Sequence, residues 1–162
     1  MTTYQEITEK VIAFSNARAD YWHELQGVAL DFAKEFEDSL DLEWETWDDN
    51  NGVEHKYVEI GIIENGKFDI KHPGQLAGKN DLSLPFVMRI ALEEGPNVLP
   101  KFYYRVEASI KSGGEFYIFN IDSGENKFEF KVKKHNTPEK FSDVIAAIKK
   151  EIIQAFDAGI FR

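Results

Sequence analysis

Apolar residues recur at every third or fourth position over the first part of the chain, which is the one-face period of an amphipathic helix. The members of this stripe are Tyr4, Ile7, Val11, Phe14, Tyr21, Leu25, Val28, Phe32 and Phe36. Thr3 and Glu6 have the spacing of a capping box, which marks the start of the helix. A helix from Thr3 to about Asp38 would be roughly 50 Å long, so the pattern also allows a bend near "SNARAD" or at Gly27.

The apolar period changes to two after Leu40, as in a half-buried strand. Leu42, Trp44 and Thr46 alternate with Asp41, Glu43, Glu45 and Trp47, so a strand would carry its carboxylates on the face opposite Trp44. The sequence "DDNNG" then has the composition of a turn, and Val58, Ile60 and Ile62 have the spacing of a return strand. The segment therefore predicts a β-hairpin.

Alternation resumes in several later segments, at residues 68–70, 86–92, 102–110, 116–121 and 128–132. A last helix is predicted from Thr137 as N-cap and Pro138 at its first position. Its apolar face consists of Phe141, Val144, Ile145, Ile148, Ile152 and Phe156. This order predicts one α+β domain over residues 1–162. Its core is a mainly antiparallel meander sheet of six or seven strands, flanked by a long N-terminal and a C-terminal amphipathic helix.

The net charge of −10 is concentrated in one segment of the chain. Residues 35–64 contain eleven acidic residues and a single basic one, Lys56, whereas acids and bases balance in the rest of the sequence. A local negative field of this kind repels nucleic acid and anionic membranes and attracts basic proteins. The other interpretation is a solvated face that only aids solubility.

The sequence contains no pattern that predicts catalysis or cofactor binding. Cysteine is absent, the four histidines are isolated, and "DDNNG" does not fit a calcium loop, since Gly52 at the sixth position would put Trp47 and Val58 at the first and twelfth. Glu43 and Glu45 would lie about 7 Å apart on a strand but without an apolar wall to raise one pKa. We therefore expect a protein without enzymatic activity, metal or cofactor. The lack of cysteine, of a signal peptide and of a membrane span predicts a cytoplasmic location.

Aromatic residues at outward positions of the predicted strands supply possible interface anchors. These are Trp47, Tyr57, Tyr103, Tyr117 and Phe119, unless a helix covers them. Together with the charge, they predict a surface that binds a basic protein partner. We expect this surface to comprise Asp41, Glu43, Glu45, Trp47, Asp48, Asp49, Glu54, Tyr57 and Glu59.

Size and charge are similar to those of small acidic bacterial proteins such as immunity proteins of nuclease toxins, and an inhibitor of that type is the favoured function. One alternative is a small-ligand-binding module with an aromatic cavity between sheet and helix, lined by Phe102, Tyr104, Phe116 and Phe128. A second alternative is an acidic secretion chaperone.

Overall fold

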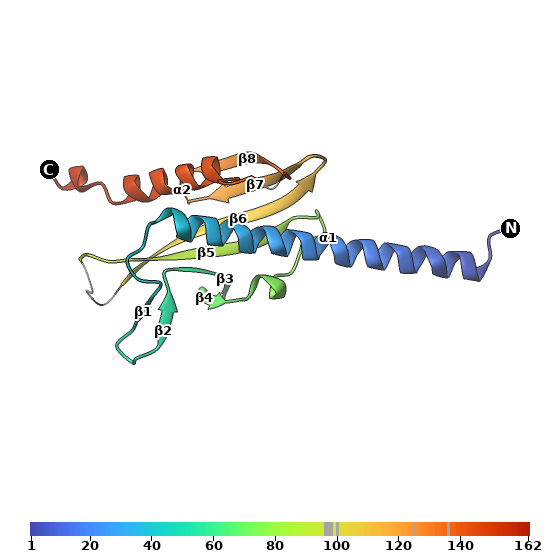
Figure 1. The fold of residues 1–162 in the computed structure, drawn as a ribbon, viewed down its shortest axis with the longest axis horizontal. Helices are drawn as coiled ribbons and strands as arrows, with labels where there is room; N and C mark the ends of the chain where they lie inside the picture. The colour runs from blue at the N-terminus through green and yellow to red at the C-terminus, as the bar shows by residue number, and fades with distance from the viewer. Residues whose placement is uncertain (96–98, 100, 125, 136) are drawn as a thin grey trace.

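The structure, a computed structural model, describes residues 1–95, 99, 101–124, 126–135 and 137–162. It begins with α1 (Tyr4–Ser39), which runs without interruption through "SNARAD" and Gly27. The capping box predicted at Thr3 and Glu6 is present. Only the C-terminal half of α1 packs on the rest of the molecule, while its N-terminal half projects beyond it (Figure 1).

Six strands form one antiparallel sheet, which confirms the predicted α+β class. Its strands are β3 (Val58–Glu64), β4 (Lys67–Ile70), β5 (Leu84–Leu92), β6 (Phe102–Gly113), β7 (Phe116–Asp122) and β8 (Lys127–Lys133). The order across the sheet is β4-β3-β5-β6-β7-β8. The sheet departs from a simple meander at one place, because β5 pairs with β3 rather than with β4. A short 3-10 helix, η1 (Pro73–Gln75), lies in the connection that makes this possible.

The predicted hairpin exists, but it is shorter than the sequence indicated and separate from the main sheet. It consists of β1 (Thr46–Asp48) and β2 (Glu54–Lys56), with "DDNNG" in the connection. The prediction of a strand that begins near Leu42 is wrong over residues 42–45, which pair with no other strand. The reason is that β3, its expected partner, pairs with the longer apolar strand β5 instead.

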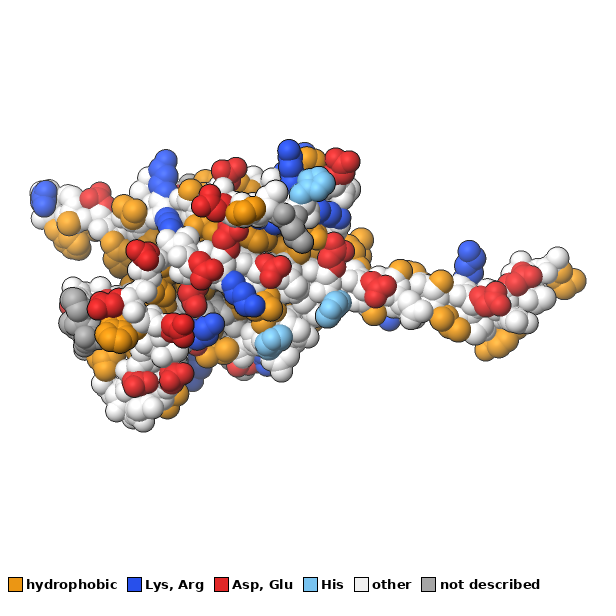
Figure 2. Space-filling view, in the orientation of Figure 1, with side chains coloured by type: hydrophobic (Ala, Val, Ile, Leu, Met, Phe, Trp, Pro, Cys, Tyr) orange, Lys and Arg blue, Asp and Glu red, His pale blue; other side chains and the backbone are white. Residues whose placement is uncertain are grey.

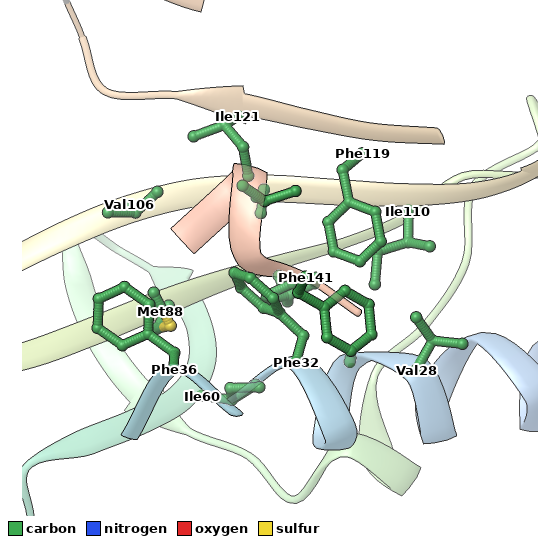
Figure 3. Packing of buried hydrophobic residues seen from close by; sticks show 14 of the residues in the cluster. Val28, Phe32, Phe36, Ile60, Met88, Val106, Ile110, Phe119, Ile121 and Phe141 are labelled. Atoms are coloured by element: carbon green, nitrogen blue, oxygen red, sulfur yellow. The ribbon is translucent and has the colours of Figure 1, made fainter. Parts of the chain in front are cut away.

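Both helices cover the same face of the sheet, and the core lies between them and the strands (Figure 1). Phe32 of α1 is at its centre (Figure 3), with ring centroids 5.3 Å from Phe119, 5.6 Å from Phe141 and 6.4 Å from both Phe86 and Phe36. These rings fill the space between sheet and helices.

The last helix begins later than predicted. α2 (Ser142–Ala155) starts after a turn at residues 138–141, and its N-cap residue Phe141 makes no side-chain capping bond. Thr137 and Pro138 thus precede the helix instead of opening it. Beyond α2 the chain ends in the 3-10 helix η2 (Ala158–Phe161), which contributes no buried residue. Over the part of the chain described, no helix is both long and apolar enough to cross a bilayer.

Candidate functional site

Acidic side chains gather where the C-terminal end of α1 meets the β1–β2 hairpin (Figures 1 and 2). We call this region the acidic end and define it by Glu37, Asp38, Asp41, Glu43, Glu45, Asp48 and Glu54. All of these residues are exposed except Glu37, which is half-buried. Five of them, Asp41, Glu43, Glu45, Asp48 and Glu54, belong to the surface predicted from the sequence.

Two grooves cross the acidic end. The helix-side groove has a volume of about 390 Å³ and lies between α1 and the hairpin, with Glu37, Asp38, Asp41 and Glu45 in its walls. The hairpin-side groove has a volume of about 340 Å³, and its walls include Asp48, Glu54, Tyr57 and Lys101. Trp44 and Thr46 line both grooves.

The two tryptophans of this region have the opposite environments to those predicted. Trp44, expected on the buried side of a strand, is 58% exposed, whereas Trp47, expected as the exposed anchor, is 8% exposed. The inversion follows from the start of β1 at Thr46, since residue 44 then lies outside the ladder and residue 47 points toward the sheet. Trp44 is thus the accessible indole of the acidic end.

Trp47 holds the hairpin against the main sheet. It forms a small buried cluster with Tyr57 and Ala91, and its ring stacks on His55 with centroids 4.8 Å apart. The ammonium of Lys101 lies 5.6 Å from the Trp47 ring centroid and 5.7 Å from that of Tyr57 and is also ion-paired with Glu93. These aromatic rings therefore already hold one cation of the chain itself. Because Trp47 and Tyr57 are both buried, neither can be the surface anchor that the sequence suggested.

Asp49 stabilises the hairpin turn and does not point freely into solvent. Its carboxylate accepts hydrogen bonds from the backbone N–H groups of Asn51 (2.8 Å) and Val53 (3.0 Å) and lies 2.9 Å from Nε2 of His55. The hydrogen bond with His55, followed by that from Val53, lowers the pKa of Asp49 below its ordinary value. The predicted partner contact at Asp49 is therefore already satisfied within the chain.

Glu59 is also engaged inside the molecule. It is buried on β3, and its carboxylate accepts a hydrogen bond of 2.8 Å from the guanidinium of Arg89. That guanidinium is sandwiched between the rings of Phe68, 4.4 Å from the centroid, and Tyr103, 4.0 Å from the centroid. Glu59 thus neutralises a partly buried cation. Of the aromatic residues expected to face outward, only Tyr103 is exposed, since Trp47, Tyr57, Tyr117 and Phe119 are all buried.

The charges of the acidic end repel one another in the free protein. Asp48 and Glu54 are directly opposite across the hairpin, an arrangement that destabilises a strand pair. The last turn of α1 contains no basic residue, so Glu37 and Asp38 add to the negative end of the helix dipole. Two cations lie near: Lys56, whose ammonium is 3.8 Å from the carboxylate of Glu37, and Lys101, which is in the wall of the hairpin-side groove and is paired with Glu93. A positively charged ligand would relieve this repulsion.

Glu37 and Asp38 belong to the acidic end but not to the surface predicted from the sequence. The sequence contained a signal for them, because acidic residues in the last turn of a predicted helix oppose its dipole and seldom serve stability. No such signal existed for Trp44, whose exposure depends on where the ladder of β1 begins.

The aromatic cavity of the alternative prediction is not formed by the residues expected to line it. Tyr104 and Phe128 pack against the core, whereas Phe102 is exposed. Phe116 precedes the buried Tyr117 on β7 and therefore points to the other face of the sheet. A hollow of about 610 Å³ does lie against the sheet, and of the four expected residues Phe128 alone belongs to its lining, which also includes the charged Glu107, Asp122 and Lys127.

Within the described residues, no group of three His, Cys, Asp or Glu side chains is arranged to hold a metal ion. Comparisons of the chain with protein-family models, with curated proteins and with solved structures each found no match.

Proposed function

We propose that the acidic end binds a positively charged segment of a partner protein, with Trp44 as its central contact. One observation carries this proposal: Trp44 is 58% exposed and lines two grooves whose walls contain carboxylates. An exposed indole flanked by carboxylates matches the side chains of arginine and lysine, which combine an apolar stem with a cationic head.

The energetics of the free protein support this assignment. Like charges that face each other at Asp48 and Glu54 cost stability, and a basic partner would convert that cost into binding free energy. The Lys101 ammonium over Trp47 and Tyr57 is an example of the same recognition within the chain. The surrounding field would also accelerate association with a basic protein.

The narrower form of the proposal is an inhibitor of the immunity type, which covers the basic groove of a partner such as a nuclease toxin. The groove of a nuclease is basic because it binds phosphates, so an acidic surface with an aromatic centre can occlude it. Catalysis has no part in this function, and the secretion-chaperone alternative would use the same surface for a basic cargo.

Charge reversal at the acidic end tests the proposal. Glu43→Lys with Glu45→Lys should slow association with an arginine-rich peptide, used as the probe, and flatten the dependence of its rate on salt. Glu115→Lys with Glu129→Lys is the matched control, because these exposed carboxylates lie outside the acidic end and their reversal gives the same net charge. Stopped-flow measurements at several salt concentrations separate the two variants. If both variants associate at the same rate, the acidic end is only a solvated face.

A further inference from the structure

The N-terminal half of α1 presents an apolar stripe that no other part of the described chain covers (Figure 2). Its members are Tyr4, Ile7, Val11 and Phe14, and their exposed fractions are 84%, 52%, 58% and 66%. The alternating spacing of three and four is that of the a and d positions of a coiled coil. The same stripe continues into Leu25, Val28 and Phe32, which are buried against the sheet.

A projecting helix of this kind needs a partner. Helices in water are marginally stable on their own, because most helical stability in proteins comes from packing the apolar face. The residues beside the stripe include Thr8, Ser15 and Ala17, which are small and leave room for a second helix to approach closely.

A groove lies at the base of the projecting segment, where α1 meets the body of the molecule. It has a volume of about 550 Å³, and Phe14, Tyr21, Trp22 and Leu82 supply its apolar walls. The base is held firmly, since the Tyr21 hydroxyl donates a 2.6 Å hydrogen bond to the carbonyl of Leu82 and accepts one from the Ser112 N–H. The shape of the groove is therefore fixed by contacts within the fold.

The two carboxylates at the tip of α1 lie off the apolar stripe. The first turns of α1 contain Glu6 and Glu9, with Lys10 as the single base among them. The lining of the groove contains the two cations Arg18 and Lys79 and no carboxylate. With the stripe at a and d, Glu6 and Glu9 take outer positions of the heptad, so the tip of one molecule presents its apolar face to the apolar walls of another molecule's groove.

We infer that this surface binds a second copy of the chain, as an antiparallel pair in which each tip occupies the groove of the other molecule. In the antiparallel register that pairs a with d positions, Val11 of one copy packs on Phe14 of the second copy, and Tyr4 reaches Tyr21 of the second copy. Lys10 then faces Ala17, and Ile7 faces Arg18, whose apolar stem packs at the seam while its guanidinium stays in solvent. The arrangement is two-fold symmetric and closed, which limits assembly to a dimer.

The surface available is large enough for such a dimer. A fully exposed aromatic side chain has an accessible surface of about 200 Å², and an aliphatic one has somewhat less. Multiplied by their exposed fractions, the four stripe residues expose roughly 450 Å² per copy. Two mutually covered stripes and the walls of both grooves together reach about 1,000 Å², which is the lower limit for a specific interface.

Two neighbouring substitutions on α1 test the dimer. Val11→Glu lies on the stripe and should weaken self-association by about 100-fold or more, because it places an unpaired charge in an apolar contact. Ile12→Glu is the matched control, since Ile12 is 55% exposed but lies one residue away, off the stripe. Sedimentation equilibrium of the whole chain should give twice the 18.6 kDa monomer mass for the wild type and for Ile12→Glu, and the monomer mass for Val11→Glu.

Cysteine cross-linking tests the antiparallel register in a chain that has no cysteine of its own. Thr8→Cys and Ser15→Cys should form disulfide-linked dimers when the two variants are mixed and oxidised, but not when either is oxidised alone. Cross-linking of Thr8→Cys with itself would overturn the antiparallel arrangement. A monomeric wild type at about 100 µM, a concentration far above the Kd of specific interfaces, would overturn the dimer and assign the stripe to a different protein.

Discussion

The carboxylate of Glu35 on α1 accepts a hydrogen bond of 2.9 Å from the backbone N–H of Phe141, at the start of α2. The N-terminal N–H groups of a helix have no partner within the helix, and Phe141 has no capping side chain of its own. A residue 106 positions away therefore caps α2, and the charge of Glu35 also suits the positive end of the helix dipole. Lys149 of α2 makes a second link, from its ammonium to the carbonyl of Ser39 at 2.8 Å.

Removal of this cap should destabilise the fold. We expect Glu35→Ala to lower the free energy of unfolding by about 1 kcal/mol, since both a helix cap and a charge-assisted hydrogen bond are lost. Glu35→Gln should lose less, because the amide oxygen can still accept the hydrogen bond. Urea denaturation measures both variants, and equal stability of Glu35→Ala and the wild type would contradict the capping role.

Truncation of the α2 core face should be costly, whereas truncation of its outer face should not. Ile148 is 2% exposed, so Ile148→Ala should lower the free energy of unfolding by roughly 2–5 kcal/mol. Ile153 is 73% exposed on the same helix, and Ile153→Ala should change it by less than about 0.5 kcal/mol. A loss below about 1 kcal/mol for Ile148→Ala would mean that α2 is peripheral to the core.

Substitution of Trp44 should affect binding, whereas substitution of Trp47 should affect stability. Trp44→Ala should leave the free energy of unfolding within about 0.5 kcal/mol of the wild type. It should raise the dissociation rate constant of the arginine-rich probe by a factor that corresponds to about 2 kcal/mol of binding free energy. Trp47→Ala should instead destabilise the packing of the hairpin by about 3 kcal/mol, because it removes a buried aromatic ring. Chemical denaturation and probe dissociation, measured on both variants, test the assignment. The reverse pattern would restore Trp47 as the anchor.

The stability of the β1–β2 hairpin should depend on pH through Asp49. Its pKa is lowered from 3.8 in the folded state, so the folded protein holds this proton less tightly than the unfolded chain. The resulting stabilisation is fully present above the unfolded value and is lost as the pH falls through the lower, folded value. His55→Phe keeps a ring on Trp47 but removes the hydrogen bond, so the pKa of Asp49 should rise toward 3.8. Carboxyl NMR titration checks this, with the exposed His135→Phe as control. An unchanged Asp49 pKa in His55→Phe would exclude His55 as its cause.

The periodicities of the chain determined its class by themselves. The spacing of three and four in α1 and α2, and of two in the long strands, distinguishes helix from strand, because a side chain's face depends on its position in the repeat. The location of the negative charge is likewise a property of the sequence. Five of the nine predicted surface residues are exposed for this reason, since carboxylates without a partner remain in water.

Tertiary structure decided which of those residues are accessible. Glu59 is buried because Arg89, thirty positions away, neutralises it on the next strand, and no local pattern reveals that pairing. Trp44 and Trp47 exchanged environments because β3 pairs with β5, which leaves the hairpin only three residues in each strand. The apolar stripe of α1 is uniform in the sequence, yet only its second half packs on the sheet. The length of a helix depends on local sequence, whereas the part of it that is buried depends on where the strands lie.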